Sequence, residues 1–196
     1  MKHIKTMRSI ALSLMTFVAV QGCTPATTMV NMHDDRGAPV LGLDYRDFEF
    51  AATESISKML ATGAVNNPKG GRYVLAISRV TNDTQQYIDT DQLVKKIRVA
   101  LLDSKKVVVT TAVGLTGPED PLSARVNELG APGKHPVLPE LSLSGKILQR
   151  NLAIDRRNQQ VEYYFNLTLT QIETGLAIWE NETVIGKRGS SQTVTW

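Results

Sequence analysis

Apolar residues recur at helical spacing in three stretches of the chain. In each stretch they fall three or four positions apart, as on the buried face of an α-helix, and a residue able to cap a helix stands just before them. In the third stretch the cap, Asp120, is followed by proline at the first helical position. The sequence therefore predicts three helices, with the apolar stripes Phe48, Ala52, Ile56, Met59; Leu93, Ile97, Ala100, Leu101; and Leu122, Val126, Leu129.

Alternating and β-branched stretches indicate five strands. The clearest is residues 161–170, where apolar side chains alternate strictly with polar ones, the pattern of a strand with one buried face. Turn sequences flank it at residues 155–158 and 174–175, as a hairpin on each side requires. The predicted strands cover residues 73–80, 107–111, 141–154, 161–170 and 176–185.

The order of these elements predicts the fold class. Residues 44–196 amount to about 150 residues, enough for one domain with its own core. We expect an α/β (α+β) domain with a mixed, mainly antiparallel sheet of about five strands, flanked by about three helices and ending in a β-meander. Alternation in the central strand means that one face of the sheet is covered and the other is wetter.

The first 22 residues resemble the signal peptide of a bacterial lipoprotein. A basic start precedes an apolar stretch, residues 10–20, that is too short to span a bilayer. The stretch ends in Val20-Gln21-Gly22-Cys23, which resembles a lipobox, the motif whose cysteine is acylated and becomes the new N-terminus. We predict lipidation, including palmitate, at Cys23. The alternative is an ordinary cleaved signal with an unrelated cysteine.

Residues 23–43 are predicted to form a lipidated, flexible linker. They are rich in Thr, Asn, Asp, Gly and Pro and follow neither structural period. If flexible, about 20 residues have a root-mean-square reach of roughly 25 Å and an extended limit of about 65 Å. Three adjacent potential ligands, His33-Asp34-Asp35, cannot enclose an ion on such a segment, so we predict no metal site. Thr24 follows the cysteine where, by resemblance to lipoprotein sorting rules, aspartate would favour the inner membrane. We therefore expect the outer membrane, facing the periplasm.

Net charge argues against a nucleic-acid partner. The chain has 22 Lys and Arg against 19 Asp and Glu, but Lys2, Lys5 and Arg8 belong to the leader, which contains no acid. The mature chain is therefore balanced, and its remaining basic pairs are scattered rather than gathered on one face. Cys23 is also the only cysteine, which excludes an intramolecular disulfide.

The sequence carries no convincing catalytic constellation. The mature chain has two histidines, His33 in the linker and His135 in a proline-flanked loop, and no serine lies in a nucleophile elbow. Phosphate-binding glycine motifs are absent. Glu119, Asp120 and Glu140 are candidate carboxylates for glycan cleavage, but nothing predicts a pair set across a cleft. We predict a protein that is not an enzyme and that needs no cofactor.

A binding function remains, and one segment suits it. Residues 79–89 join a predicted strand to a predicted helix and are long and polar, with Tyr87 as an amphipathic anchor among hydrogen-bonding groups, a composition common at interfaces. The alternative is that Tyr87 or Ile88 merely packs against the helix that follows. The candidate partner-binding residues are Arg79, Asn82, Thr84 and Tyr87.

Three further stretches resemble LpoB-type lipoproteins. Ser57-Lys58-Met59-Leu60 is similar to the end of the helix that opens their globular domain. Ser78-Arg79-Val80-Thr81-Asn82-Asp83-Thr84 is similar to their polar strand-end segment. Glu173-Thr174-Gly175-Leu176-Ala177-Ile178-Trp179 resembles their closing hairpin, a feature shared with CsgG-type lipoproteins. With the lipobox, the resemblance extends over roughly residues 44–187.

The resemblance implies an outer-membrane lipoprotein that activates peptidoglycan synthesis, and hence cell-wall biogenesis and cell shape. LpoB-type proteins dock on an accessory domain of a bifunctional class A penicillin-binding protein and stimulate it. Their enterobacterial members have a longer, proline-rich linker, whereas this linker has only Pro25 and Pro39. Two alternatives stay open: a self-assembling structural or secretion lipoprotein of the CsgG type, and a lipoprotein that binds peptidoglycan as a passive anchor.

Overall fold

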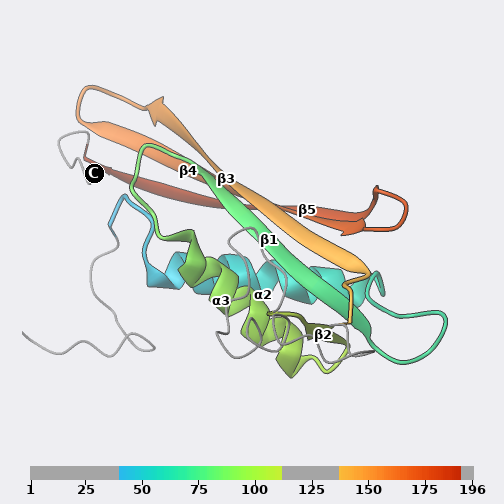
Figure 1. The fold of residues 1–196 in the computed structure, drawn as a ribbon. Helices are drawn as coiled ribbons and strands as arrows, with labels where there is room; N and C mark the ends of the chain where they lie inside the picture. The colour runs from blue at the N-terminus through green and yellow to red at the C-terminus, as the bar shows by residue number, and fades with distance from the viewer. Residues whose placement is uncertain (1–39, 112–136, 191–196) are drawn as a thin grey trace, which may run out of the picture. The chain divides into compact units, whose positions relative to one another are not determined.

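The computed structural model describes residues 40–111 and 137–190, in which five strands and two helices form the α+β domain that the sequence predicts (Figure 1). The third predicted helix, with Leu122 to Leu129, lies outside the described residues. The elements are α2 (Tyr45–Ala61), β1 (Tyr73–Asp83), α3 (Thr90–Asp103), β2 (Val107–Val109), β3 (Leu141–Ala153), β4 (Asn158–Gln171) and β5 (Leu176–Ser190).

All five strands belong to one mixed sheet in the order β2-β1-β3-β4-β5. β1 runs parallel to both β2 and β3, whereas β3, β4 and β5 form an antiparallel meander. The predicted turn at Thr174-Gly175 is present, and Gly175 adopts a positive φ of 70° there, a conformation that favours glycine. The two antiparallel ladders are longer than the two parallel ones, because tight hairpins let successive strands pair along their whole length. The sheet is therefore mainly antiparallel, as predicted.

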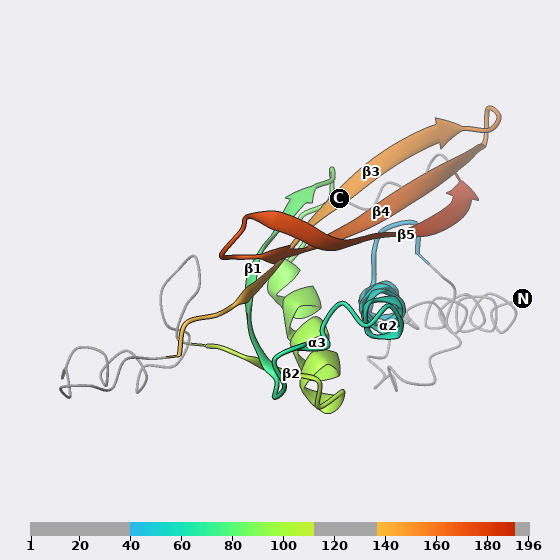
Figure 2. The same ribbon diagram turned by 90° about the vertical axis from the view of Figure 1, so that its right-hand side faces the viewer.

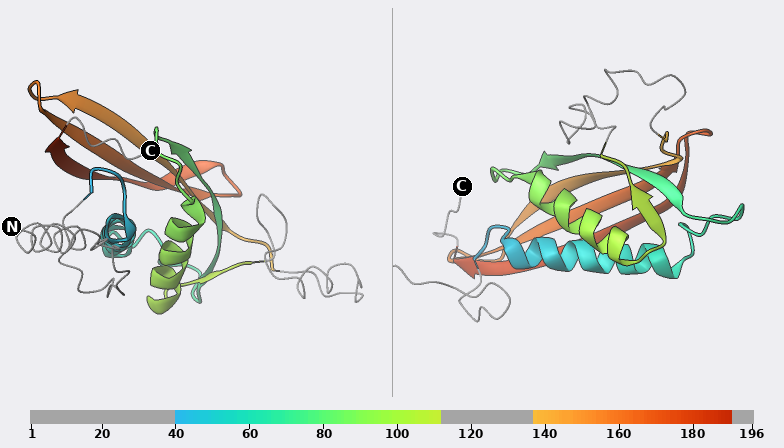
Figure 3. Two further views of the ribbon diagram at one scale, coloured as in Figure 1. Left: turned by 90° about the vertical axis from the view of Figure 1, so that its left-hand side faces the viewer. Right: turned by 60° about the horizontal axis from the view of Figure 1, so that its bottom comes forward.

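Both helices lie on the same face of the sheet (Figures 2 and 3). The alternation in β4 decides this arrangement, since Val161, Tyr163, Phe165, Leu167 and Leu169 are all buried beneath the helices while the residues between them are half-buried. The opposite face, which we call the uncovered face, carries no helix within the two described ranges. Neither helix combines the length and apolar character needed to cross a bilayer.

α2 begins and packs as the sequence predicts. Its N-cap is Asp44, which accepts hydrogen bonds from the backbone N–H groups of Arg46 and Asp47, and the Asp47 carboxylate accepts from the Asp44 N–H in return. This reciprocal capping box satisfies N–H groups that a helix start leaves free. A buried polar contact also fixes α2 on β5, because the Ser55 and Thr183 hydroxyl oxygens lie 3.0 Å apart.

Gly145 allows β3 and β4 to pack beneath the helices. A Cβ atom at this position would lie 2.7 Å from Cδ2 of Leu167 and 3.1 Å from the carbonyl oxygen of Asn166. The Leu167 side chain therefore occupies the space that a side chain at residue 145 would need. The contact is close because Gly145 and Leu167 are directly paired across the two strands.

We predict that Gly145→Ala lowers the free energy of unfolding by about 1–3 kcal/mol, because the added methyl overpacks the core. Urea unfolding measures the change. Gly186→Ala is the matched control, since Gly186 also lies in a strand and no atom comes within 4 Å of its would-be Cβ. Equal stability of the two variants would contradict the packing argument.

Candidate partner-binding site

The segment between β1 and α3 is held in a fixed conformation by its own side chains. Asn82 donates from Nδ2 to the carbonyl oxygen of Gln86 at 2.9 Å, and its Oδ1 accepts from the backbone N–H and the hydroxyl of Thr84 at 3.1 and 2.7 Å. The Gln86 N–H donates to the Thr84 hydroxyl at 3.2 Å. Asn82 and Thr84 are two of the four predicted partner-binding residues. Their polar side-chain groups are therefore engaged in hydrogen bonds within this turn.

The same turn is attached to β3. Gln85 donates from its backbone N–H to Oε1 of Gln149 at 3.1 Å, and its own Oε1 accepts from Nδ2 of Asn151 at 3.1 Å. Hydrogen bonds to a neighbouring strand reduce the freedom of a loop before any partner arrives. We call residues 84–89 the Tyr87 loop.

Tyr87 projects from this loop into solvent. It is 98% exposed, the highest value among the large apolar residues of the described chain, while the next residue, Ile88, packs against the core. Of these two residues, Ile88 packs against the core and Tyr87 does not. A rigid loop that displays an aromatic side chain is the kind of feature that becomes a binding hot spot.

Arg79 lies elsewhere in the fold. The β1–β3 register shifts between Ile77 and Val80, so Ser78 and Arg79 form a β-bulge against β3. The hydroxyls of Ser78 and Ser142 lie 2.8 Å apart, and Ser142 belongs to the uncovered face because the flanking Leu141 and Leu143 are buried under the helices. Arg79 is exposed at this bulge, three residues back from Asn82. The structure thus places Thr84 and Tyr87 in the Tyr87 loop, bonds Asn82 at the end of β1 to that loop, and sets Arg79 apart.

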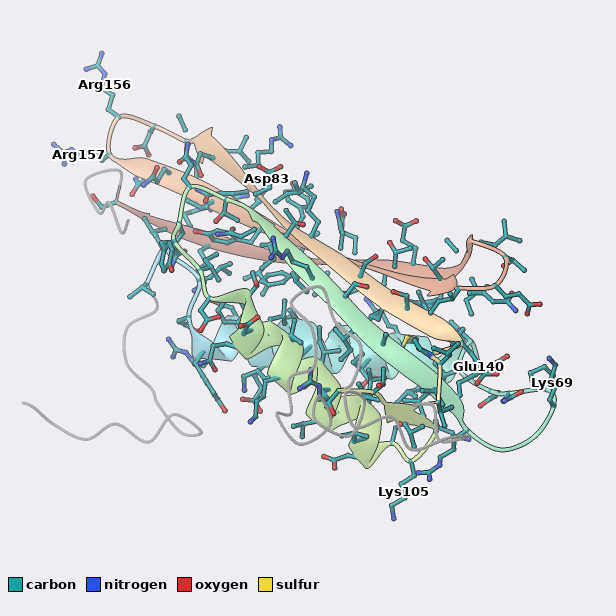
Figure 4. All side chains as sticks on the ribbon, in the orientation of Figure 1. Lys69, Asp83, Lys105, Glu140, Arg156 and Arg157 are labelled. Atoms are coloured by element: carbon teal, nitrogen blue, oxygen red, sulfur yellow. The ribbon has the colours of Figure 1, made fainter. Side chains whose placement is uncertain are left out.

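Charged groups lie at the end of β1 and at the tip of the β3–β4 hairpin. Asp83, where β1 ends, forms an ion pair of 2.8 Å with Lys146 of β3. At the tip of the β3–β4 hairpin, Arg156 and Arg157 extend outward (Figure 4). Asp155 shapes this tip by accepting from the N–H groups of Arg157 and Asn158 at 2.7 and 2.8 Å. Together with a hydrogen bond from the Asn158 side chain, these N–H groups lower the pKa of Asp155.

The last three residues of the predicted linker make hydrogen bonds to the globular domain. Leu41, Gly42 and Leu43, which we call the tether end, are buried. Their three carbonyl oxygens accept hydrogen bonds from Tyr163 Oη (3.2 Å), Lys187 Nζ (2.7 Å) and Gln86 Nε2 (3.2 Å), respectively. These contacts come from residues 43 to 145 positions away in the chain. The local composition of the segment could not reveal them and therefore suggested only flexibility.

Lys187 is the centre of a partly buried ion cluster beneath the tether end. Besides Gly42, its Nζ contacts the carboxylate of Asp47 at 2.5 Å and that of Asp44 at 3.5 Å. Burial acts to raise the pKa of Asp44, but hydrogen bonds from Arg46 and the charge of Lys187 outweigh it and the pKa is lowered. Burial also raises the pKa of Tyr163 to about 12, so its hydroxyl stays protonated and able to donate.

Sequence reasoning missed Gln86, Lys187 and Tyr163. Lys187 carried a signal, because it stands two residues after Ile185 on the side of β5 that faces the helices, where a charged residue needs a buried partner.

Among the predicted catalytic candidates, Glu140 accepts a 3.3 Å hydrogen bond from the Val74 N–H, and Glu119 and Asp120 lie outside the described residues. No cluster of three His, Cys, Asp or Glu that could hold a metal occurs in residues 40–111 or 137–190.

The sequence matches a known family over most of this domain. The family model described as peptidoglycan-synthase activator LpoB matches residues 47–185. The chain belongs to the LpoB family. The match begins within α2 and ends within β5, so it includes most of these two elements and all the described elements between them, as well as the Tyr87 loop. Among curated protein sequences none matches this chain.

Solved structures of LpoB proteins are similar to the chain at low identity. The LpoB C-terminal domain from Salmonella enterica is 17% identical over 71% of this chain and 98% of that domain, with a TM-score of 0.42. The NMR structure of Escherichia coli LpoB is 16% identical over 87% of each chain, with a TM-score of 0.44. The PelC dodecamer from Paraburkholderia phytofirmans is 14% identical over 66% of this chain and 80% of that chain, with a TM-score of 0.31. At these TM-scores the family assignment rests on the sequence match.

We predict that Asp44→Asn destabilises the domain by about 1 kcal/mol or more near neutral pH, because the charged hydrogen bonds of the carboxylate are lost. Since the folded pKa lies below the ordinary 3.8, the stabilising effect of Asp44 is present above that value and disappears as pH falls through the folded pKa. The gap between the two proteins should therefore close in acid, which urea unfolding at several pH values measures.

Asp83→Asn is the control for this pH series. The Asp83 and Lys146 side chains are 60% and 47% exposed, and such an ion pair contributes at most about 1 kcal/mol. Its loss should change stability by less than the loss of the Asp44 carboxylate near neutral pH. A gap for Asp44→Asn that stays constant into acid would contradict the role assigned to the Asp44 charge.

Proposed function

We propose that this protein is an outer-membrane lipoprotein that binds and activates a bifunctional class A penicillin-binding protein. The match to the peptidoglycan-synthase activator family over residues 47–185 carries the proposal. The chain itself performs no chemistry on the wall polymer. Its contribution is contact with the accessory domain of the synthase, and the soluble domain faces the periplasm on a lipid tether.

The proposed docking surface is the Tyr87 loop, with Tyr87 as its aromatic anchor. Three observations support this choice: Tyr87 is 98% exposed, hydrogen bonds within the turn fix the backbone before it, and Gln85 ties the loop to β3. A pre-ordered loop loses little conformational freedom on binding, so more of the contact energy appears as affinity. The predicted contacts of Asn82 and Thr84 are therefore indirect, through the shape of the turn.

Activation follows from preference for one state of the partner. A ligand that binds the active conformation of the synthase more tightly than the inactive one raises the active population by the ratio of the two affinities. A lipid on Cys23 adds a spatial limit, because the contact forms only where the linker reaches. With the tether end bound into the domain, about 18 residues remain between the lipid and the fold, an extended limit of roughly 60 Å.

We predict that the chain from Thr24 onward stimulates polymerisation of lipid II by one of the organism's class A penicillin-binding proteins. This chain retains the compact unit of residues 37–196. Tyr87→Ala should weaken binding to that synthase about tenfold or more, because a hot-spot aromatic is lost. Phe50→Ala is the matched control, since Phe50 is another exposed aromatic (54%) but lies on α2.

These measurements distinguish the alternatives. Stimulation that is lost with Tyr87→Ala and kept with Phe50→Ala supports both the function and the surface. Stimulation unaffected by Tyr87→Ala places the docking surface elsewhere. An absence of binding to every class A synthase overturns the function and favours the assembly or peptidoglycan-anchor alternatives, which the mass of the purified chain in solution and sedimentation with isolated sacculi then separate.

We predict that Cys23→Ser abolishes incorporation of radiolabelled palmitate and releases the protein from the outer-membrane fraction. The thiol is the acyl acceptor in a lipobox, and a hydroxyl does not replace it. Fractionation of cells that express the two proteins measures the difference. Unchanged labelling and unchanged membrane association would exclude Cys23 as the anchor.

A further inference from the structure

The tether end, which bends at Leu41 and Gly42, is bound by side chains of the domain. Three side chains, from β4, from β5 and from the Tyr87 loop, each donate to one successive backbone carbonyl of residues 41–43. The Leu41 side chain also packs on Gly189, where a Cβ atom would come within 3.1 Å of it. These side-chain contacts fix the path of the chain as it enters the fold, at the same end of the sheet as the loop that leads into α3 (Figure 1).

Gln86 connects this segment to the Tyr87 loop. Its side-chain amide makes both hydrogen bonds that the Leu43 backbone offers, accepting from the N–H at 2.8 Å and donating to the carbonyl at 3.2 Å. Its own backbone carbonyl accepts from the Asn82 amide at 2.9 Å. One residue therefore joins the tether end to the turn that precedes Tyr87.

We propose that Gln86 is a positioning residue for partner binding, through which the bound tether end holds the Tyr87 loop in its docking conformation. This inference rests on the proposed function. Its physical basis is that a loop already fixed before binding loses less conformational entropy on binding than a loop that the partner must order. Because coupling between two sites is reciprocal, a bound synthase also strengthens the hold of the domain on its tether end.

The coupling predicts an effect at a distance. Lys187 donates to the Gly42 carbonyl from β5 and pairs with Asp44 and Asp47, so its loss acts on the Tyr87 loop at a distance, through the tether end and the start of α2 that follows it. Gln86→Met removes both hydrogen bonds to Leu43 and keeps the length of the side chain. Once Gln86→Met has disconnected the tether end, Lys187→Met should have no further effect on affinity.

A double-mutant cycle tests this with the chain from Thr24 onward and the synthase that it binds. We expect Gln86→Met and Lys187→Met each to weaken binding about fivefold, the loss that one hydrogen bond of ordinary strength gives, and the double variant to bind like either single one. Amide hydrogen exchange in residues 84–88 should accelerate in all three. Gly145→Ala, which lowers stability elsewhere, should leave affinity unchanged and so control for general destabilisation.

Tyr163→Phe provides a second variant if Lys187→Met does not fold, since it removes only the hydroxyl that donates to Leu41. Wild-type affinity for Gln86→Met, or losses that multiply in the double variant, would overturn the coupling. These outcomes differ from failure of the proposed surface. If Tyr87→Ala weakens binding and Gln86→Met does not, only the coupling is wrong, whereas wild-type affinity of Tyr87→Ala removes the Tyr87 loop itself as the docking surface.

Discussion

β4 pairs along its length with β3 on one side and β5 on the other, and its alternation decides which face of the sheet the helices cover. A shift of one residue in either ladder would carry the apolar set of β4 to the wet face. Gly145 adds a steric condition, because Leu167 fills the space above it only in the observed register. The contacts that α2, α3 and the tether end make with the sheet all depend on the apolar side chains of β4 lying on the helix-covered face.

The ion cluster at Lys187 depends on the same register. Lys187 pairs with Val161 of β4, which places its side chain on the helix side at the start of α2. There it meets Asp44 and Asp47, the two residues that cap the helix. The capping box, the ion cluster and the hold on Gly42 are thus one polar assembly, and it marks the point where the tether joins the fold.

The sequence predicted the elements well because their signals are local. The caps of α2 and α3, the alternation in β4 and the Thr174-Gly175 turn each depend on residues a few positions apart, and all appear in the structure. The burial of the tether end was not predicted, because it depends on Gln86, Tyr163 and Lys187, which no local pattern connects to it. For the same reason Asn82 and Thr84 looked like free polar groups, although they bond to their own loop.

The position of the tether end also bears on how far the protein reaches. In the proposed complex, a partner docked on the Tyr87 loop sits beside the tether end, because Gln86 binds Leu43 directly. Tyr163, in the middle part of β4, donates to Leu41, so β4 continues past this point in both directions. Under the proposed function, the distance spanned is set by the short linker and by how far the synthase projects, so lengthening the linker extends the reach directly.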